Sequence, residues 1–374
     1  MGMLSSTLFP ETYEESRARF RADLARVQML WRDARLHAHC IDAAEDATID
    51  WIAAHAERRE RLVIFTTGEH GIEGYVGSAM LKIFVDEFLP RLDPTTTGIL
   101  LVHTINPWGM KHKRRTNAHN VDLNRNFLWN SAPDKSFNPD YARLAAMLMP
   151  RGRVRNLAVS QLAFLARLLW RNARDGAGKI RATTLLGQYA HARGIFYGGD
   201  AIQEETRVLI GLLREWMREY AQIVHLDMHT GYGPRYQMQL VNSRFEQTDS
   251  REFEKRFNYP RVSKATSNEF YEIRGDLIDF VYALAQNEFP NQRVYSTTFE
   301  FGTLGDSTWN AVESLRIKVL ENQMYWYGAD DSARAKIARE FEELYAPRDE
   351  QWRAKAIADA RQAFDGILRA EGFV

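Results

Sequence analysis

Short apolar segments rich in branched residues alternate along the chain with longer segments of helical periodicity, and this alternation restricts the fold more than any other feature. Strands are predicted at 61–67, 98–104, 221–228, 238–242 and 293–301. Helices are predicted at 11–36, 72–89, 204–220, 277–286 and 310–327. Short continuous apolar runs are typical of strands buried on both faces. The alternation therefore predicts an α/β protein with three layers, α/β/α, around a mixed, mostly parallel sheet.

The organisation of the chain indicates one domain with additions. Its 374 residues, 45% of them hydrophobic, are enough to bury a large core, and we predict a single domain over 1–374. The stretch at about 130–199 interrupts the alternation with Pro, Gly and Arg clusters around a helical segment. We interpret it as a helical insertion, either a lid beside an active site or a layer that only packs. Two charge-rich helices are expected at about 331–372.

The overall charge and hydropathy of the chain give no support to several classes of partner. Lys plus Arg equal Asp plus Glu at 49 each, so nothing favours nucleic acid or a membrane surface. The most apolar helical segment, 157–170, is interrupted by Ser160, Gln161 and Arg167 and is not expected to span a bilayer. The single cysteine, Cys40, cannot form an internal disulfide and is expected to be a small buried hydrophobe rather than a nucleophile. A cytoplasmic protein is the default expectation, and a homo-oligomer is left open.

The richest local motif is TTGEHGIEGYVGSAM, which follows the first clear strand. His70 and Glu73 are three residues apart, so both side chains can reach one cation from a helical turn. Three glycines allow the backbone to turn tightly there. Ligands of open α/β sheets bind outside the carboxyl ends of the strands, and this position favours a metal site over a solvated polar pair.

A second polar group ends the strand in IVHLDMHTGYGP. Asp227 and His229 are two residues apart and share one face of the strand. His225 shares that face but lies deeper, and we interpret it as a packed core histidine. His229 completes a set of two histidines and one glutamate, which suits a catalytic zinc with one position left for water.

Glu300 lies in an apolar, aromatic strand, where burial of a carboxylate is costly without a partner or a function. Beside a metal site, this carboxylate could take a proton from water and pass it to a leaving amine. Considered alone, a structural pairing with an arginine is the stronger interpretation.

The segment NPWGMKHKRRTNAHNVDLNRNF lies between these sites and is dense in hydrogen-bond donors. Arg115, Asn124 and Arg125 supply many of these donors. An arginine offers a planar fork that can grip a carboxylate, and an arginine near the metal could also stabilise an oxyanion. Asp122 could orient a ligand histidine by a hydrogen bond to the ring nitrogen that does not bind the metal.

These four sites, in this order, resemble the zinc carboxypeptidase (M14) superfamily, and most closely its DUF2817 branch, over roughly 61–303. The motifs that carry the resemblance are His70-Gly71-Ile72-Glu73, the stretch from Arg115 to Arg125, His229 and Glu300.

The resemblance implies a role for each matched residue. The implied zinc ligands are His70, Glu73 and His229, around one Zn²⁺. Arg115 would be the oxyanion-stabilising residue, Asn124 and Arg125 the substrate-carboxylate clamp, and Glu300 the general base.

Two positions depart from the family pattern or match it weakly. Asn120 stands where the family has glycine. The family's mobile tyrosine should precede a glycine by four residues, and Tyr271 with Gly275 fits that spacing, although Tyr232 competes for the role.

The leading hypothesis is a carboxypeptidase-like hydrolase of an amide bond in a small peptide or amino-acid conjugate that carries a free carboxylate. The alternatives are an N-acyl amino acid deacylase of the aspartoacylase and succinylglutamate desuccinylase type, and a non-catalytic binding protein. A second metal ion is left open, with Glu69, His225 and Asp227 as candidate ligands.

Overall fold

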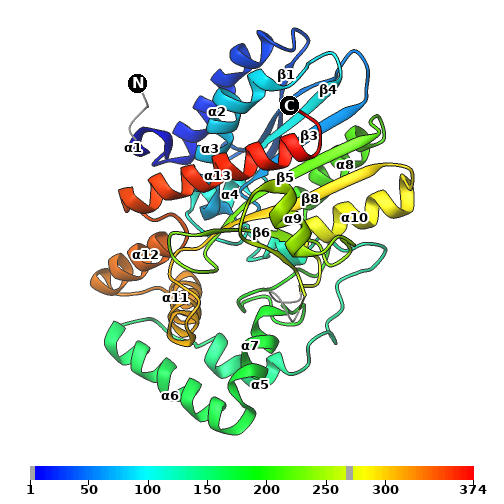
Figure 1. Ribbon diagram of the computed structural model, residues 1–374. Helices are drawn as coiled ribbons and strands as arrows, with labels where there is room; N and C mark the ends of the chain where they lie inside the picture. Colours follow the sequence, from blue (N-terminus) through cyan, green and yellow to red (C-terminus); the bar gives the residue numbers. More distant parts are fainter. Residues whose placement is uncertain (1–4, 267–272) are drawn as a thin grey trace.

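The computed structural model describes residues 5–266 and 273–374, which form an α/β structure around one mixed sheet (Figure 1). The strands are β1 (Arg35–Asp42), β2 (Ala47–Ala54), β3 (Arg61–Thr67), β4 (Thr97–His103), β5 (Gln222–Thr230), β6 (Met238–Asn242), β7 (Val262–Lys264) and β8 (Arg293–Phe301). Their spatial order is β1-β2-β4-β3-β5-β8-β6-β7. Strands β4, β3, β5 and β8 run parallel at the centre of the sheet, while β1, β2 and β6 add antiparallel pairs. The predicted mixed sheet is therefore confirmed.

Helices cover both faces of the sheet, which buries the apolar central strands (Figure 1). On one face α2 (Tyr13–Gln28), α3 (Gly74–Ile83) and α13 (Glu350–Ala370) pack in one hydrophobic core. On the other face α8 (Glu204–Met217) and α10 (Leu277–Glu288) pack in a second core. Because the central strands bury apolar side chains on both faces, the three layers predicted from the alternation are formed.

Further helices complete the chain. They are α1 (Ser5–Leu8), α4 (Pro107–Lys111), α5 (Tyr141–Leu148), α6 (Leu157–Asp175), α7 (Ala177–Leu185), α9 (Ser250–Phe257), α11 (Thr308–Tyr327) and α12 (Asp331–Tyr345). Single turns or short distorted helices are η1 (Gly71–Glu73), η2 (Phe84–Phe88), η3 (Leu89–Arg91) and η4 (Leu123–Arg125). None of the described helices is long and apolar enough to cross a membrane.

The amino-terminal region differs from the prediction. The helix expected over 11–36 ends at Gln28, and the chain then enters the edge strand β1. None of the residues of this edge strand is buried, so β1 (RLHAHCID) lacks the continuous apolar run by which the buried strands were recognised. The expectation that Cys40 is buried is wrong for the same reason, because it lies exposed on this strand.

The segment at 130–199 folds into α5, α6 and α7, which enclose a small hydrophobic core of their own against α11. Phe164 of α6, Ile180 of α7 and Val319 of α11 are members of this core. Leu185 and Phe196 from the same segment also line the main cavity described below. The segment thus packs as a layer and supplies part of a cavity wall.

Candidate metal centre

The register of the central strands brings the predicted site residues to one edge of the sheet. Strands β5 and β8 pair in parallel with His229 opposite Glu300. His70 follows the end of β3, the strand on the other side of β5. The turn after β3 depends on Gly68, whose φ is +64° and whose missing Cβ would lie 1.8 Å from Thr104 Oγ1. Any other residue at this position would be strained and would displace the loop that carries His70.

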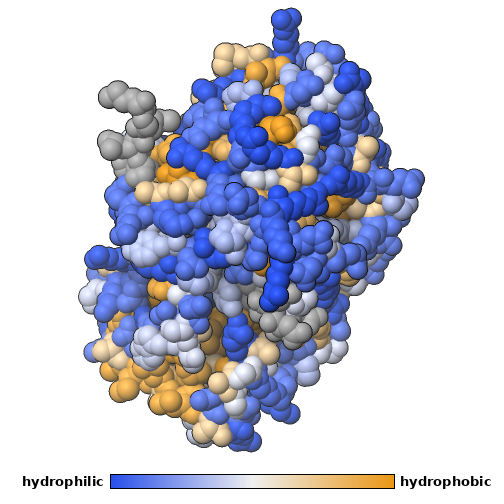
Figure 2. Space-filling view, viewed as in Figure 1, coloured by the Kyte–Doolittle hydropathy of each residue, from blue (hydrophilic) through white to orange (hydrophobic). Residues whose placement is uncertain are grey.

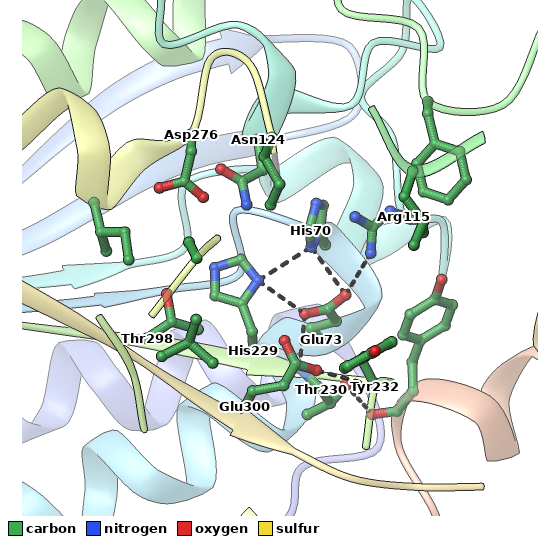
Figure 3. A pocket seen from close by; sticks show the side chains of 18 of the residues that line it. His70, Glu73, Arg115, Asn124, His229, Thr230, Tyr232, Asp276, Thr298 and Glu300 are labelled. Atoms are coloured by element: carbon green, nitrogen blue, oxygen red, sulfur yellow. Dashed lines mark hydrogen bonds and ion pairs between the residues drawn. The ribbon is translucent and has the colours of Figure 1, made fainter. Parts of the chain in front are cut away.

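The two imidazoles approach each other through their Nδ1 atoms, beside the buried carboxylate of Glu73 (Figure 3). His70 Nδ1 and His229 Nδ1 are 3.2 Å apart. Oxygens of Glu73 lie 2.9 Å from the first of these nitrogens and 3.3 Å from the second. Thr230 N–H donates to Glu73 Oε2 at 2.8 Å and fixes its orientation. Two nitrogens and a carboxylate that converge in this way, each residue at most 3% exposed, fit one divalent cation of the zinc type.

The outer nitrogen of each histidine is bonded to a carboxylate. Asp122 Oδ1 lies 2.9 Å from His70 Nε2, and Asp227 Oδ2 lies 2.6 Å from His229 Nε2. A carboxylate in this position holds the proton on Nε2 and leaves the Nδ1 lone pair for a metal. The donor set therefore has the supporting groups that metal-binding histidines require.

The electrostatics of the cluster match this arrangement. Burial alone would raise the pKa of Glu73, but the neighbouring His70 and His229 hold that pKa well below its ordinary value. Burial would lower the pKa of His229, but Asp227 above all holds it well above its ordinary value. Burial and the charge of Arg115 would lower the pKa of His70, but Glu73 and Asp122 raise it overall. Without a metal the two histidines are thus stabilised as cations, and a bound divalent ion would replace the Nδ1 protons and supply positive charge at the same place.

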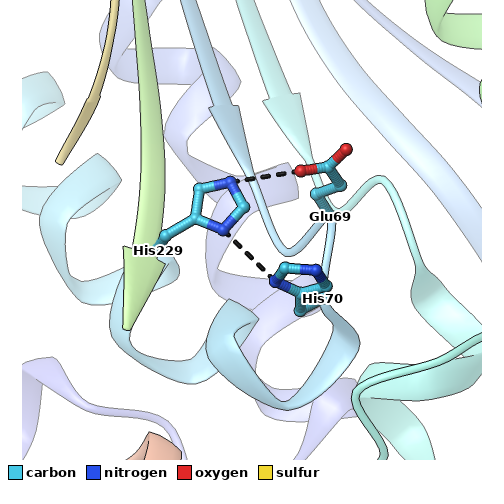
Figure 4. Close-up of side chains that lie close together, drawn as sticks. All are labelled: Glu69, His70 and His229. Atoms are coloured by element: carbon cyan, nitrogen blue, oxygen red, sulfur yellow. Dashed lines mark hydrogen bonds and ion pairs between the residues drawn. The ribbon is translucent and has the colours of Figure 1, made fainter. Parts of the chain in front are cut away.

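A second glutamate, Glu69, also lies close enough to be a candidate ligand, because Glu69, His70 and His229 place ligand atoms within 4.8 Å of one another. Figure 4 shows that Glu69 approaches the edge of the His229 ring that faces away from His70. Its Oε2 is 3.2 Å from His229 Nε2, the nitrogen that already contacts Asp227. We favour Glu73 as the ligand, because its carboxylate contacts both Nδ1 atoms.

His225 is a packed core histidine, as interpreted from the sequence. Its Nδ1 lies 2.8 Å from Ser296 Oγ and its Nε2 lies 2.9 Å from Thr66 Oγ1. Burial lowers its pKa to about 4, so it is neutral at physiological pH. Since hydroxyls occupy both ring nitrogens, His225 is a poor candidate for a second metal ion.

Glu300 lies beside the histidine–glutamate cluster, at the wall of a cavity that His70, Glu73 and Arg115 also line (Figure 3). Its Oε1 accepts a hydrogen bond from Tyr232 N–H at 3.0 Å. Burial, followed by the negative charge of Glu73, raises the pKa of Glu300 to about 7. A carboxylate with a pKa near neutrality can accept a proton and return it, which is what a general base requires. Among residues 5–266 and 273–374, no arginine forms a salt bridge with Glu300. The pairing with an arginine that the sequence alone favoured is therefore not found there.

Arg115 lines the same cavity and is tied to the centre by two carboxylates. Its Nη1 donates to Glu73 Oε1 at 3.0 Å, and its Nε donates to Asp122 Oδ2 at 3.2 Å. Its guanidinium carbon lies 5.6 Å and 5.9 Å from the ring centroids of Phe196 and Tyr345. These contacts hold a planar cation at the cavity wall, next to the candidate metal position.

Asn124 and Arg125 are adjacent in sequence but differ in their placement. Asn124 lines the cavity, and its Oδ1 accepts from Leu277 N–H at 3.0 Å, which leaves its amide nitrogen to face the cavity. Arg125 is 1% exposed and donates to the carbonyls of Asn124 and Leu185 at 2.8 and 2.7 Å. It is not among the residues that line the cavity. A role of Arg125 in gripping a substrate carboxylate stays a prediction that would require this side chain to turn.

Two further predictions concern the loops. Asn120, which replaces the family's glycine, has a φ of +61°, and asparagine is among the residues that tolerate this left-handed conformation best. Asparagine can therefore replace the family's glycine here without a change in the backbone conformation. Tyr271 lies outside the described residues, and its role stays a prediction.

The polar residues of the cavity that sequence reasoning missed include Lys318, Tyr345 and Asp276. Lys318 belongs to α11, and burial, followed by the charge of Arg115, lowers its pKa to about 7. Asp276 caps α10 by accepting from Asp279 N–H at 3.0 Å. Each lies in a helix or at a helix terminus, where a single polar residue carries no local signal of function.

Solved structures match this chain at low sequence identity. Bovine thrombin-activatable fibrinolysis inhibitor, in complex with tick carboxypeptidase inhibitor, is 15% identical over 87% of this chain and 96% of that chain, with a TM-score of 0.45. Carboxypeptidase A from Helicoverpa armigera is 14% identical over 90% of this chain and 74% of that chain, also with a TM-score of 0.45. Murein-tripeptide amidase MpaA from Escherichia coli O157 is 17% identical over 80% of this chain and 95% of that chain, with a TM-score of 0.38.

A search of curated proteins found no significant match. A family model described as protein of unknown function, DUF2817, matches residues 9–359, which is most of the chain and includes every residue of the centre described above. The protein belongs to the DUF2817 family.

Proposed function

We propose that this protein is a zinc-dependent hydrolase of an amide bond, with carboxypeptidase-like action on a small peptide or amino-acid conjugate that has a free carboxylate. One observation carries the proposal. The Nδ1 atoms of His70 and His229 converge on Glu73, and the strand register places Glu300 beside them at the wall of the same cavity. A hydrolase needs this combination of a cation site and a neighbouring base.

When bound, zinc would lower the pKa of an attacking water and polarise the scissile carbonyl. The remaining work falls to residues of the chain. Glu300 takes one proton from the attacking water and delivers it to the nitrogen of the leaving amine, so that the carboxylate is regenerated. Burial raises the pKa of this carboxylate, which favours its acceptance of the proton from water. Arg115, fixed by Glu73 and Asp122, presents positive charge to the oxygen that becomes negative in the transition state.

Substrate contacts are proposed at two ends of the cavity. At one end of the cavity, near α10 and Asp276, the side-chain amide nitrogen of Asn124 could donate a hydrogen bond to the substrate. At the other end Lys318 Nζ lies 5.9 and 5.8 Å from the centroids of Phe196 and Tyr345, the same two rings that Arg115 contacts. The two cations are therefore neighbours. An anionic group of the substrate would be attracted there, and its charge would restore the ordinary pKa of Lys318.

The test is the isosteric change Glu300→Gln. We expect the variant to keep its zinc and to lose turnover by about 100-fold or more, because the amide cannot accept the proton. The matched control is Glu205→Gln, which changes another buried glutamate, with a pKa also raised by burial, that does not line the cavity. Wild-type turnover in the Glu300 variant would refute the proposed mechanism.

The substrate class is tested with two sets of compounds, short peptides with free carboxyl termini and N-acyl amino acids. The proposal predicts faster hydrolysis of the peptides, and blocking their terminal carboxylate should raise KM. Faster hydrolysis of N-acyl amino acids would instead assign the protein to the deacylase alternative. A zinc-loaded sample that hydrolyses neither set would contradict both enzymatic assignments and favour a binding protein.

A further inference from the structure

The helix α6 presents an apolar face to solvent. Six exposed apolar side chains recur along it at helical spacing, namely Val159, Leu162, Ala166, Leu169, Trp170 and Ala173, while the exposed Arg167, Asn172 and Arg174 lie beside them. The large ones are 63% (Val159), 69% (Leu162), 68% (Leu169) and 54% (Trp170) exposed. Half of the exposed large hydrophobic side chains of the described residues lie on this one helix. Figure 2 shows the patch at the lower left, over α6.

This exposure is not a by-product of core packing. The opposite side of α6 supplies Phe164, Leu165 and Leu168 to the hydrophobic core of the 130–199 segment. A surface helix of a soluble protein normally has charged residues opposite such a face. Here both sides are apolar, so the outward face is a contiguous patch of the kind that marks an interaction surface.

The segment that carries α6 is also strongly basic. Residues 141–181 contain eight arginines, one lysine and a single acidic residue, Asp175, which gives a net charge of +8. Because the whole chain has a net charge of zero, the remaining residues carry a net charge of −8. Arg155, Arg167 and Arg174 are exposed, and the described residues provide no ion pair to any of them. The apolar face is therefore bordered by unpaired positive charge.

We propose that α6 docks this protein on an anionic membrane surface, with its axis in the plane of the interface. A helix with Leu and Trp on one face and arginines along its edges is the form that binds at the boundary between head groups and acyl chains. Arginines beside the patch would meet anionic head groups. The guanidinium carbons of Arg171 and Arg174 lie 4.5 and 5.6 Å from the Trp170 ring, which places cations beside the residue that suits this boundary best.

Other occupants fit less well. In a second copy docked on the same face, two segments of charge +8 would oppose each other. Spanning the bilayer is excluded, since α6 is not long and apolar enough to cross a membrane. The inference is independent of the proposed hydrolase activity, because it uses no residue of the metal centre.

The test is flotation of the full-length protein with vesicles. We expect the wild-type protein to bind vesicles of phosphatidylcholine mixed with phosphatidylglycerol and to dissociate from them as the salt concentration rises. We expect no binding to vesicles of pure phosphatidylcholine. The double variant Leu162→Ser, Leu169→Ser should bind at least about tenfold more weakly. The control is Met29→Ser, which removes a side chain that is 73% exposed at the end of α2, at the opposite end of the molecule from α6 (Figure 1).

Because all three substituted side chains are largely exposed, thermal unfolding should be unchanged in every variant, and circular dichroism checks this. Absence of binding to the mixed vesicles, or equal binding by the double variant, overturns the proposal. Dimerisation that the double variant abolishes overturns it in favour of a second copy. Binding to soluble poly-L-glutamate but not to vesicles overturns it in favour of an acidic protein partner.

Discussion

Removing the charge of Asp227 should weaken metal binding without removing a ligand. Asp227 is 1% exposed, and its Oδ2 lies 2.6 Å from His229 Nε2. A hydrogen bond between charged partners contributes about 1.5–3 kcal/mol. Asp227→Asn keeps the size of the side chain but turns this contact into a neutral one, and it no longer forces the proton onto Nε2. Losing most of this contribution corresponds to a zinc Kd that is roughly 10–100-fold higher.

The assay is competition for zinc between the protein and a chromophoric chelator at fixed pH. Asp50→Asn is the matched control. Asp50 is also fully buried on a strand, and its Oδ2 forms an ion pair with Arg21 Nε at 2.5 Å, but it does not belong to the candidate metal centre. We expect the Kd of the control to equal that of the wild type. An unchanged Kd in the Asp227 variant, or an equal loss in both variants, would refute the reasoning that this carboxylate prepares His229 for a metal.

Three further predictions concern stability and binding. Burial lowers the pKa of His103 to about 3, so this side chain stays neutral in the folded protein. In the unfolded chain it is protonated below about pH 6.5. The contribution of His103 to stability is therefore fully present above pH about 6.5 and is lost as the pH falls toward about 3. Urea titrations should show about 2 kcal/mol less stability from this residue at pH 5 than at pH 7.5, and His103→Gln should remove that part of the decline. Gly275→Ala should lower the free energy of unfolding by about 2–3 kcal/mol, because φ at this position is +79° and a Cβ would lie 2.4 Å from the carbonyl oxygen of Arg125. An unchanged melting temperature would contradict this prediction. Lys318→Met should raise KM for anionic peptides about tenfold with little change in kcat, whereas a loss confined to kcat would argue for a role in the chemical step.

The sequence was informative where a local pattern and a structural role coincide. Strands β3, β6 and β8 were predicted with the observed bounds, because their continuous apolar runs reflect burial on both faces. His70, Glu73, His229 and Glu300 could be grouped because strands that run parallel end at the same edge of a sheet. The family assignment to DUF2817, made from those motifs, is confirmed.

The rest depends on packing that no local pattern encodes. Strand β1 was missed because an edge strand carries polar residues, and Cys40 was misplaced with it. Lys318 reaches the cavity only through the way α11 packs beside Arg115. The neutral charge of the whole chain concealed the basic segment around α6, because an acidic remainder balances it.

The central claim is that His70, Glu73 and His229 hold one zinc ion, and a comparison of two neighbouring glutamates tests it most directly. Zinc per protein chain should be measured by elemental analysis after dialysis for the wild type, Glu73→Gln and Glu69→Gln. Both glutamates are buried in the same loop and lie within 3.3 Å of a His229 ring nitrogen, but only Glu73 contacts both Nδ1 atoms. We predict one equivalent of zinc in the wild type and in Glu69→Gln, and a clear loss in Glu73→Gln. Zinc that is retained in Glu73→Gln and lost in Glu69→Gln would contradict the proposed ligand set.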